Sequence, residues 1–597
     1  MEGAPATGSA RKPSALAGGP SARGPSARDH AARARAARTK GVVFKALAAS
    51  FKGNLEREWF GSPPHRAAIS RPRPVGLAAH PHDPRPIDAE RGRQLLEGLL
   101  VLDGGAVRLG ETGDPFDQPS PTRQFATALH SFDWLPHLMA AGPGATRLAL
   151  RLLQDWRRVF GTWNAFSWSG ERLERRTFHL ACAARALSPE ASDAEISAMT
   201  LDIARGARQL LKASDDPHRR LERAVVVAIA GCALTGKASD RLMAQGLKRI
   251  DALLDVIVLP DGGHASRSPE AGLELLFDLL TLDDALGQRG RPPPEALSRA
   301  IDRLSSSVRF FALADGHLAA FQGGEAIEPK RVAAALAHDD HGPRPPQSAP
   351  HVGYQKMQGG SIQVMADAGP PAVGVLSVTA CAQPAAVEIV FGKDRLITSC
   401  GWSPEATGAN AFRLSGAAST VSVGDGSAGR PLSGWRSEAL GPWLVDGATD
   451  VEVKRHDGDA GVWLDIVHDG WRRLGLTHAR RLYLDLKADE LRGEDSLIPI
   501  VSTNADGPRR YLPFSVTFHL HPDARASLAR DGKSVLIKGP SNVGWWLRND
   551  AVDVAITPSA HFDHGLSRPA GAIMLKSQVR PEKGAKIRWK LVRATDH

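Results

Sequence analysis

One histidine of this chain lies in a loop whose composition suits ligand chemistry. The stretch LPDGGHASRSPEAGLELLFDLL, residues 259–280, places His264 directly after two glycines and three residues before Arg267, at the start of a helical pattern. A glycine-rich turn lets the backbone approach a ligand, and a helix N-terminus favours anions. We predict that His264 and Arg267 contact an anionic group. The alternative is a histidine that only caps a turn.

A second set of polar and aromatic residues lies in the stretch FGTWNAFSWSGERLERRTFHL, residues 160–180. Spacings of four and seven residues place Arg172, Arg176 and His179 on one face of a predicted helix. Tryptophan rings nearby are suited to stacking on sugar rings, although aromatic residues at helix ends more often belong to a core. The predicted substrate-binding residues of this stretch are Trp163, Asn164, Trp168, Arg176 and His179.

Tyr354 is one of three tyrosines in the chain and lies at the predicted join between two domains, where a cleft would open. It either contacts substrate or packs in the interface. His519 and His521 share one face of a predicted strand but lack a third ligand, so we predict no metal and no other cofactor. The four cysteines show no CxxC spacing, which argues against a metal knuckle or a disulfide scaffold.

The elements that position these residues change in kind along the chain. From about 90 to 315 the apolar residues recur at helical spacing in serial segments, which predicts a bundle, a solenoid or an α/α toroid. The proline-rich stretch 338–353 ends this pattern, and short β-branched segments of alternating polarity follow, which predicts an antiparallel β-sandwich. We therefore predict a disordered basic tail (1–45), a helical domain (46–345) and a β-sandwich domain (346–597).

The net charge of +10 and the pI near 9.6 suit a polyanionic partner, and nucleic acid, anionic polysaccharide and a membrane surface all qualify. No nucleic-acid-binding module is recognisable, so we predict no nucleic-acid partner. The sequence contains no run of about 18 apolar residues and no secretory signal, so we expect no transmembrane segment. A cytoplasmic location is the default expectation, and the periplasm or cell envelope is the alternative.

Several longer phrases resemble recurrent phrases of the heparinase II/III family, in particular of its bacterial members. They extend from about residue 55 to the C-terminus. These phrases are REWFGSPP, LHSFDWLPHL, LPDGGHASRSP, GYQKMQGGSIQVMADAGPP, THARRLYLDLKADELRGEDSL and FHLHPDARASLARDGKSVLI. The resemblance implies an α/α toroid followed by an antiparallel β-sandwich. It also implies lyase activity on uronic-acid polysaccharides, glycosaminoglycans among them.

Such a lyase works by β-elimination. A base removes the C5 proton of a uronate, an acid protonates the departing oxygen, and a third group neutralises the carboxylate. The resemblance makes His264 the base or neutraliser and Tyr354 the acid or base. The remaining predicted contacts to the acidic polysaccharide are Asn164, Arg176, His179 and Arg267.

The sequence departs from the family pattern at two places. Where characterised members continue Ser-Pro-x-Tyr-His, this chain reads SPEAG, with Ala271 and Gly272 at the last two positions. Cys381 stands where many members carry a histidine on an early sandwich strand, while Glu388 keeps the glutamate that follows it. A thiol does not shuttle protons at neutral pH unless its pKa is lowered. The alternative hypothesis is therefore a catalytically degenerate carbohydrate-binding or envelope-assembly protein.

Overall fold

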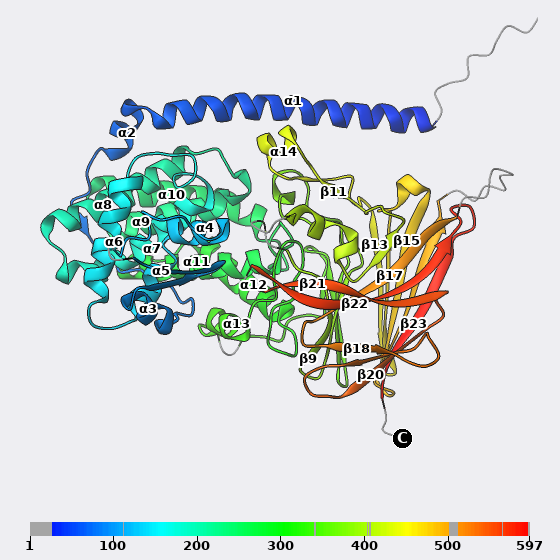
Figure 1. Ribbon diagram of the computed structural model, residues 1–597. Coiled ribbons are helices and arrows are strands. Elements are labelled where there is room, and N and C mark those ends of the chain that lie inside the picture. Colours follow the sequence, from blue (N-terminus) through cyan, green and yellow to red (C-terminus); the bar gives the residue numbers. More distant parts are fainter. Residues whose placement is uncertain are drawn as a thin grey trace, which may run out of the picture.

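The structure is a computed structural model that describes residues 27–110, 113–339, 342–402, 404, 408–500, 511–563 and 565–594, and the backbone alone for residues 27–41. Helices fill the first half and antiparallel sheets the second (Figure 1). The helices are α1 (Ala27–Gly61), α2 (Pro63–Ser70), α3 (Ala89–Leu96), α4 (Arg123–Ser131), α5 (Trp134–Met139), α6 (Ala145–Phe160), α7 (Gly170–Leu187), α8 (Asp193–Lys212), α9 (Arg220–Ala233), α10 (Lys237–Ile257), α11 (Pro269–Gln288), α12 (Glu295–Phe311), α13 (Pro329–Leu336) and α14 (Trp435–Leu440).

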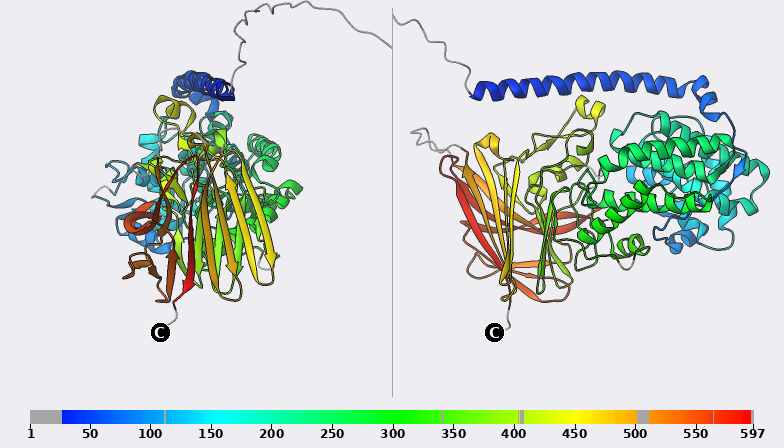
Figure 2. Two further views of the ribbon diagram at one scale, coloured as in Figure 1. Left: turned by 90° about the vertical axis from the view of Figure 1, so that its right-hand side faces the viewer. Right: turned by 180° about the vertical axis from the view of Figure 1, so that it is seen from behind.

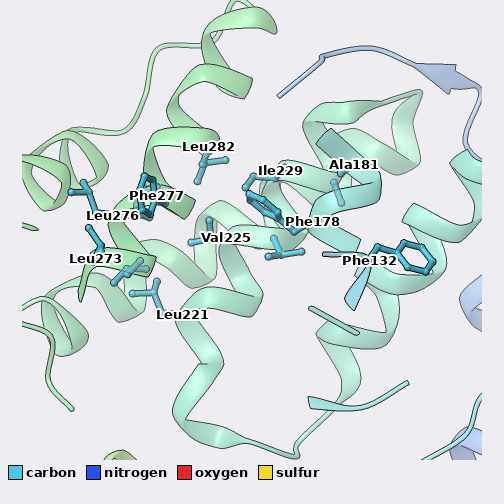
Figure 3. Packing of buried hydrophobic residues seen from close by; sticks show 14 of the residues in the cluster. Phe132, Phe178, Ala181, Leu221, Val225, Ile229, Leu273, Leu276, Phe277 and Leu282 are labelled. Carbon is cyan, nitrogen blue, oxygen red and sulfur yellow. The ribbon is translucent and has the colours of Figure 1, made fainter. Parts of the chain in front are cut away.

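The helical domain is built around α9, which is buried on every side from Leu221 to Ala233. Its sequence, RLERAVVVAIAGCA, is almost continuously apolar, as expected of a helix surrounded by other helices. Side chains of α7, α9 and α11 interdigitate in this core, where Phe178, Val225 and Phe277 lie close together (Figure 3). Gly231 lets α10 pack closely, because a Cβ there would lie 2.4 Å from the Met243 nitrogen.

The sandwich consists of two antiparallel sheets stacked face to face (Figure 2). Among the described residues one sheet has the order β21-β22-β17-β9-β8-β7-β6-β5, with β10 paired to β17, and the other has the order β13-β14-β15-β16-β23-β20-β19-β18. Their strands are β5 (Ser348–Ala349), β6 (Tyr354–Gly359), β7 (Ile362–Asp367), β8 (Val387–Phe391), β9 (Asp394–Thr398), β10 (Val421–Val423), β13 (Val451–Gly458), β14 (Gly461–His468), β15 (Leu476–Asp485), β16 (Glu490–Pro499), β17 (Leu512–Leu520), β18 (Arg525–Leu528), β19 (Val535–Lys538), β20 (Gly544–Asn549), β21 (Asp553–Asp563), β22 (Leu566–Val579) and β23 (Ala585–Arg593). Three short pairs complete the set, formed by β1 (Gly76–Leu77) with β4 (Leu234–Thr235), β2 (Leu99–Leu102) with β3 (Gly105–Arg108), and β11 (Arg430–Pro431) with β12 (Leu444–Val445).

The sandwich has its own hydrophobic core, separate from that of the helices. In β15, for example, Leu476, Leu482 and Leu484 face inward and alternate with more exposed residues. The prediction of a helical domain followed by an antiparallel β-sandwich is therefore confirmed. The predicted boundary near residue 345 falls between α13 and β5.

The predicted disordered tail is wrong for residues 27–45, which belong to α1. The composition argument overlooked that alanine and arginine are among the best helix formers. The rest of the predicted tail, residues 1–26, lies outside the described residues. Helix α1 runs along one side of both domains, with α14 packed beneath it (Figure 1). No helix among the described residues combines the length and the apolar character needed to cross a membrane.

Candidate functional site

A cleft with a volume of about 690 Å³ opens between the helical domain and the β-sandwich. Its size lies in the range of small-molecule and cofactor sites. Helices α4, α5, α7 and α11 form one wall together with the segments 83–91 and 102–103. The segment 323–331 and the sandwich residues Trp402, Pro404, Asp563 and Gly565 complete the lining. Both domains therefore contribute to one site.

Acidic side chains outnumber basic ones in this lining by ten to five. The carboxyl groups belong to Asp83, Asp88, Asp103, Asp133, Glu171, Glu270, Glu274, Glu325, Glu328 and Asp563, and the cations to Arg85, Arg91, Arg175, Lys330 and Arg331. Several of these cations are already held by carboxylates: Arg85 and Arg175 each lie 2.8 Å from Asp278, and Arg331 pairs with Glu274. Arginines in turn hold several of the carboxylates: Arg85 pairs with Asp83, Arg91 with Asp103, Arg219 with Glu171 and Arg568 with Asp563. The lining is thus richer in acidic than in basic groups, although many of them are paired, and this composition does not favour an anionic polymer.

Glu270, at the start of α11, has the most unusual environment in the cleft. Its Oε2 accepts the backbone N–H of Glu325 at 2.9 Å, and both carboxylate oxygens of Glu325 accept the N–H of Gly565 from the sandwich. Burial, and then the negative charge of Glu325, raise the pKa of Glu270 to about 8. A perturbed carboxyl group in a cleft marks a candidate functional site.

Replacing Glu270 by glutamine is expected to stabilise the protein at neutral and alkaline pH. The folded-state pKa of about 8 lies above the unfolded value near 4.5. Between these pH values Glu270 is therefore protonated in the folded protein and ionised in the unfolded chain. Wild-type stability is thus lost as pH rises through this window, and the variant avoids the loss. The expected gain in free energy of unfolding is about 4 kcal/mol at pH 8 and close to zero near pH 4.5.

Chemical denaturation of wild type and Glu270→Gln across this pH range measures the effect. The matched control is Glu295→Gln on α12, whose side chain is exposed and paired only with Arg299. Equal or lower stability of Glu270→Gln at pH 8 contradicts the assignment of a neutral, buried Glu270.

His264 lies outside this cleft lining and is only 5% exposed. Its Nδ1 accepts the backbone N–H of Ser266 at 3.1 Å, which places the ring proton on Nε2, 3.8 Å from Glu222 Oε1. Burial, and then the charge of Arg219, lower the pKa of His264 to about 4. The neutral ring is held inside the helical domain. A catalytic role for His264 stays a prediction, and these buried surroundings disfavour it.

Arg267 and Tyr354 join the two domains. The Arg267 guanidinium donates to the carbonyls of Val352, Gly353 and Gly369 and to the Asp367 carboxylate at 2.6 Å. The Tyr354 hydroxyl donates to the Arg267 carbonyl at 2.9 Å, and burial raises its pKa well above the ordinary value. Neither residue lines the cleft, and both use their polar groups in the interface. Of the two interpretations of Tyr354, the geometry favours packing.

The residues predicted in the stretch 160–180 mostly face the protein interior. Asn164 closes a turn, because its Oδ1 accepts the N–H groups of Phe166 and Ser167. Trp168 is buried and donates to the Phe160 carbonyl at 2.7 Å. Trp163 packs near Phe60, where α1 ends. None of the three tryptophan or asparagine side chains lines the cleft, so their contact with substrate stays a prediction.

Arg176 and His179 both lie on α7, but their side chains have different surroundings. The Arg176 guanidinium lies 4.3 Å from the Trp156 ring, and burial lowers its pKa to about 9. His179 does line the cleft, where its Nδ1 lies 2.9 Å from the Ser131 carbonyl oxygen. Burial lowers the pKa of His179 to about 3, so this ring is neutral at physiological pH. Of the eight predicted site residues, His179 is therefore the one found in the cleft lining.

Cys381 behaves as a buried structural thiol. Its backbone N–H donates to Gln322 Oε1 at 2.9 Å, and burial raises its pKa to about 11. A neutral thiol cannot replace imidazole as a proton shuttle. Glu388 is equally buried and pairs with Arg395 at 3.3 Å. Glu388 also accepts the backbone N–H of Ala320. Both residues are thus buried at the junction of the sandwich with the segment that follows α12. Among the described residues, no group of histidine, cysteine, aspartate and glutamate side chains is suited to a metal ion.

Sequence reasoning missed Glu270, Glu325 and Trp402. Glu270 stands in the SPEAG phrase itself, directly before Ala271, which occupies the position of the family's tyrosine. An acidic side chain at that place could have indicated a site residue. Glu325 and Trp402 come from segments far from each other in the chain, and spacing alone gives no indication that they meet.

Comparisons with known proteins agree with this architecture. Residues 341–590 match the family described as heparinase II/III-like, C-terminal. The chain is 70% identical over 556 residues to FtsZ-localized protein C of Caulobacter vibrioides, covering 93% of this chain and 96% of the relative. The chain belongs to the heparinase II/III family.

Solved structures show the same fold. A crystal structure of heparinase III matches with a TM-score of 0.68 at 12% identity, covering 89% of each chain. Heparan sulfate lyase HepC from Pedobacter heparinus matches with a TM-score of 0.53 at 14% identity, covering 89% of this chain and 87% of that one. At this identity the likeness concerns the fold alone, and function has to be argued from the site.

Proposed function

We propose that this chain is a non-catalytic member of the heparinase II/III family that attaches to a membrane surface through α1 and localises with FtsZ. The observation that carries the proposal is a continuous row of exposed apolar side chains on α1. Phe44, Leu47, Phe51, Leu55 and Trp59 are each between 49% and 74% exposed. Their spacing of three or four residues places them on one face of the helix.

This face points away from the protein body. Ala46, within the same turns, is fully buried, and α14 packs beneath the helix. Figure 2 shows α1 at the outside of the molecule in two further views. A row of five large apolar side chains in water is costly and marks an interaction surface. An amphipathic helix of this kind lies in the plane of a membrane with its apolar face in the acyl boundary.

The charge around the row favours anionic lipids. Lys45, Lys52 and Arg57 are exposed on the same helix, as is Glu58, and Lys52 lies 3.7 Å from Glu56. Residues 1–40 contain eight lysines and arginines but only two acidic residues. Basic residues near a membrane contribute about 1 kcal/mol each through attraction to the anionic leaflet. The sequence that precedes the apolar row is thus enriched in positive charge.

Two further observations support a role without catalysis. His264 and Tyr354 have no access to the cleft, and the cleft carries the charge sign of a uronate polymer rather than the opposite sign. The relative with 70% identity is named for its localisation with FtsZ and not for a reaction.

Flotation with phosphatidylglycerol and phosphatidylcholine vesicles tests the proposal. Wild type is expected to float with vesicles that contain phosphatidylglycerol. The triple variant Phe44→Ser, Phe51→Ser, Leu55→Ser is expected to bind at least about 1000-fold more weakly, since each buried large apolar side chain contributes roughly 1.5–3 kcal/mol. The matched control replaces three exposed valines outside α1, Val75, Val256 and Val552, by serine and should float like wild type. Equal flotation of the α1 variant, or self-association through the row instead of lipid binding, overturns the proposal.

The alternative function is β-elimination on a uronic-acid polysaccharide, which the family likeness and His179 in the cleft favour. It is tested by the ultraviolet absorbance of the unsaturated uronate product with heparan, hyaluronan, alginate and glucuronan. We expect no increase on any of these substrates. An increase that His264→Ala abolishes would establish the lyase and reject the non-catalytic proposal.

A further inference from the structure

We propose that the cleft between the helical domain and the sandwich is a docking groove for a basic, partly apolar peptide segment of a partner protein. The inference goes beyond membrane attachment, because the groove shares no residue with the apolar row of α1. It is argued from the charge of the groove, from its apolar surface and from an unsatisfied hydrogen-bond donor.

The carboxylates are spread along the whole groove. Asp83 and Asp103 come from the segments before and after α3, Glu171 from α7, Glu328 from the segment before α13, and Asp563 from the end of β21. Asp83, Asp103, Glu171 and Asp563 each pair with an arginine, so a basic ligand would share these carboxylates with the arginines of the protein. An extended ligand with several positive charges can contact carboxylates of both domains at once, whereas a single ammonium ion reaches only one part. The charge pattern thus fits a basic chain rather than a small cation.

The groove also carries aliphatic and proline side chains between the carboxylates. They belong to Pro86, Ile87, Leu102, Pro136, Ile327 and Pro404. Such a mixture accommodates a peptide in which apolar residues alternate with lysine or arginine. A glycan fits less well, because Trp402 is the one tryptophan of the described lining and is only 5% exposed, which leaves no open ring face for a sugar.

Trp402 supports a ligand in the groove independently of the charges. This side chain is only 5% exposed and lines the groove beside Gly323. Its buried indole N–H has no acceptor among the described residues, which do not include residues 403 and 405–407. An unsatisfied buried donor costs about 1–3 kcal/mol. The carbonyl oxygen of a docked peptide is a suitable acceptor, since extended peptides present carbonyl groups along their length.

Protonation of Glu270 couples to such binding. The groups that face its carboxyl are Glu325, Glu274 and the Arg331 guanidinium, and the carboxylates outweigh the single cation. A lysine or arginine placed beside Glu270 favours its ionised form, so binding releases a proton. Affinity for a basic peptide should therefore rise as pH increases from about 6.5 to 8.5.

Fluorescence anisotropy with the full chain and a labelled peptide, Arg-Ile-Arg-Pro-Arg-Ile-Arg, tests the inference. We expect saturable binding that weakens with salt and tightens at least threefold between pH 6.5 and 8.5. The double variant Glu270→Gln, Glu328→Gln is expected to bind about 10-fold more weakly and to lose the pH dependence. The matched control Glu295→Gln, on an exposed part of α12, should bind like wild type.

Competition separates the possible occupants. The acidic peptide Glu-Ile-Glu-Pro-Glu-Ile-Glu and a hyaluronan oligomer should not displace the probe. The peptide assignment is overturned if spermine displaces the probe at equal charge concentration. It is also overturned if a glucosamine oligomer displaces the probe more effectively than unlabelled peptide does. Unchanged affinity of the groove variant also overturns it. The serine variant of the α1 row should bind the peptide normally, so failure of this inference is distinguishable from failure of membrane attachment.

Discussion

Replacing Arg267 by alanine is expected to lower the free energy of unfolding by about 3–5 kcal/mol. The guanidinium is buried at the domain junction, where it donates to three backbone carbonyls and to Asp367. Removing it leaves the Asp367 carboxylate buried, with Gln322 as its remaining side-chain donor. The carbonyls of Val352 and Gly369 lose the Arg267 donor as well, whereas that of Gly353 keeps the backbone N–H of Ala368. Each unsatisfied buried group adds to the cost.

Urea denaturation followed by tryptophan fluorescence measures this loss. The matched control is Arg299→Ala on α12, an exposed arginine paired with exposed Glu295, for which we expect a change below about 1 kcal/mol. If Arg267→Ala cost no more than this control, Arg267 would not hold the domains together, and a role in ligand binding would regain support.

The second large effect is expected at Asp495, in the interior of the sandwich. Its carboxylate accepts from His478 Nε2 at 2.9 Å, Arg480 Nε at 2.7 Å and Trp589 Nε1 at 2.9 Å. Although burial opposes it, the charge of Arg480 holds the pKa of Asp495 well below its ordinary value. Asp495→Ala strands the Arg480 cation and should cost about 3–5 kcal/mol, because an unpaired buried charge is strongly unfavourable.

Two comparisons identify the cause of this loss. Asp465→Ala removes a partner of Arg481 on the outer face of the same sheet and should cost less than about 1 kcal/mol. The double variant Asp495→Leu, Arg480→Met removes both charges and should recover most of the stability lost in Asp495→Ala. Equal losses in Asp495→Ala and the double variant would attribute the effect to packing and not to the charge.

The helices and strands could be predicted from the sequence because their signals are local. The apolar spacing predicted a helix over 270–286, and α11 spans Pro269–Gln288, beginning at the cap that Ser268 supplies. Alternating β-branched segments likewise predicted the sandwich strands. The tail was mispredicted because charge and low aliphatic content were weighed there without the helix propensity of alanine and arginine.

The site could not be predicted in the same way, because the direction of a side chain depends on distant contacts. Spacing correctly placed His264 before a helix, but Glu222, more than 40 residues earlier, decides that its ring faces the helical interior. The helical face shared by Arg176 and His179 was real, yet only His179 reaches the cleft, since Arg176 stacks on Trp156.

Imaging of a fluorescent fusion in living cells with labelled FtsZ tests the central claim most directly. Wild type and the serine variant of Phe44, Phe51 and Leu55 are compared at equal abundance. The account predicts that wild type lies at the membrane and coincides with FtsZ, and that the variant is dispersed through the cell. A variant that still coincides with FtsZ at the membrane would contradict attachment through α1.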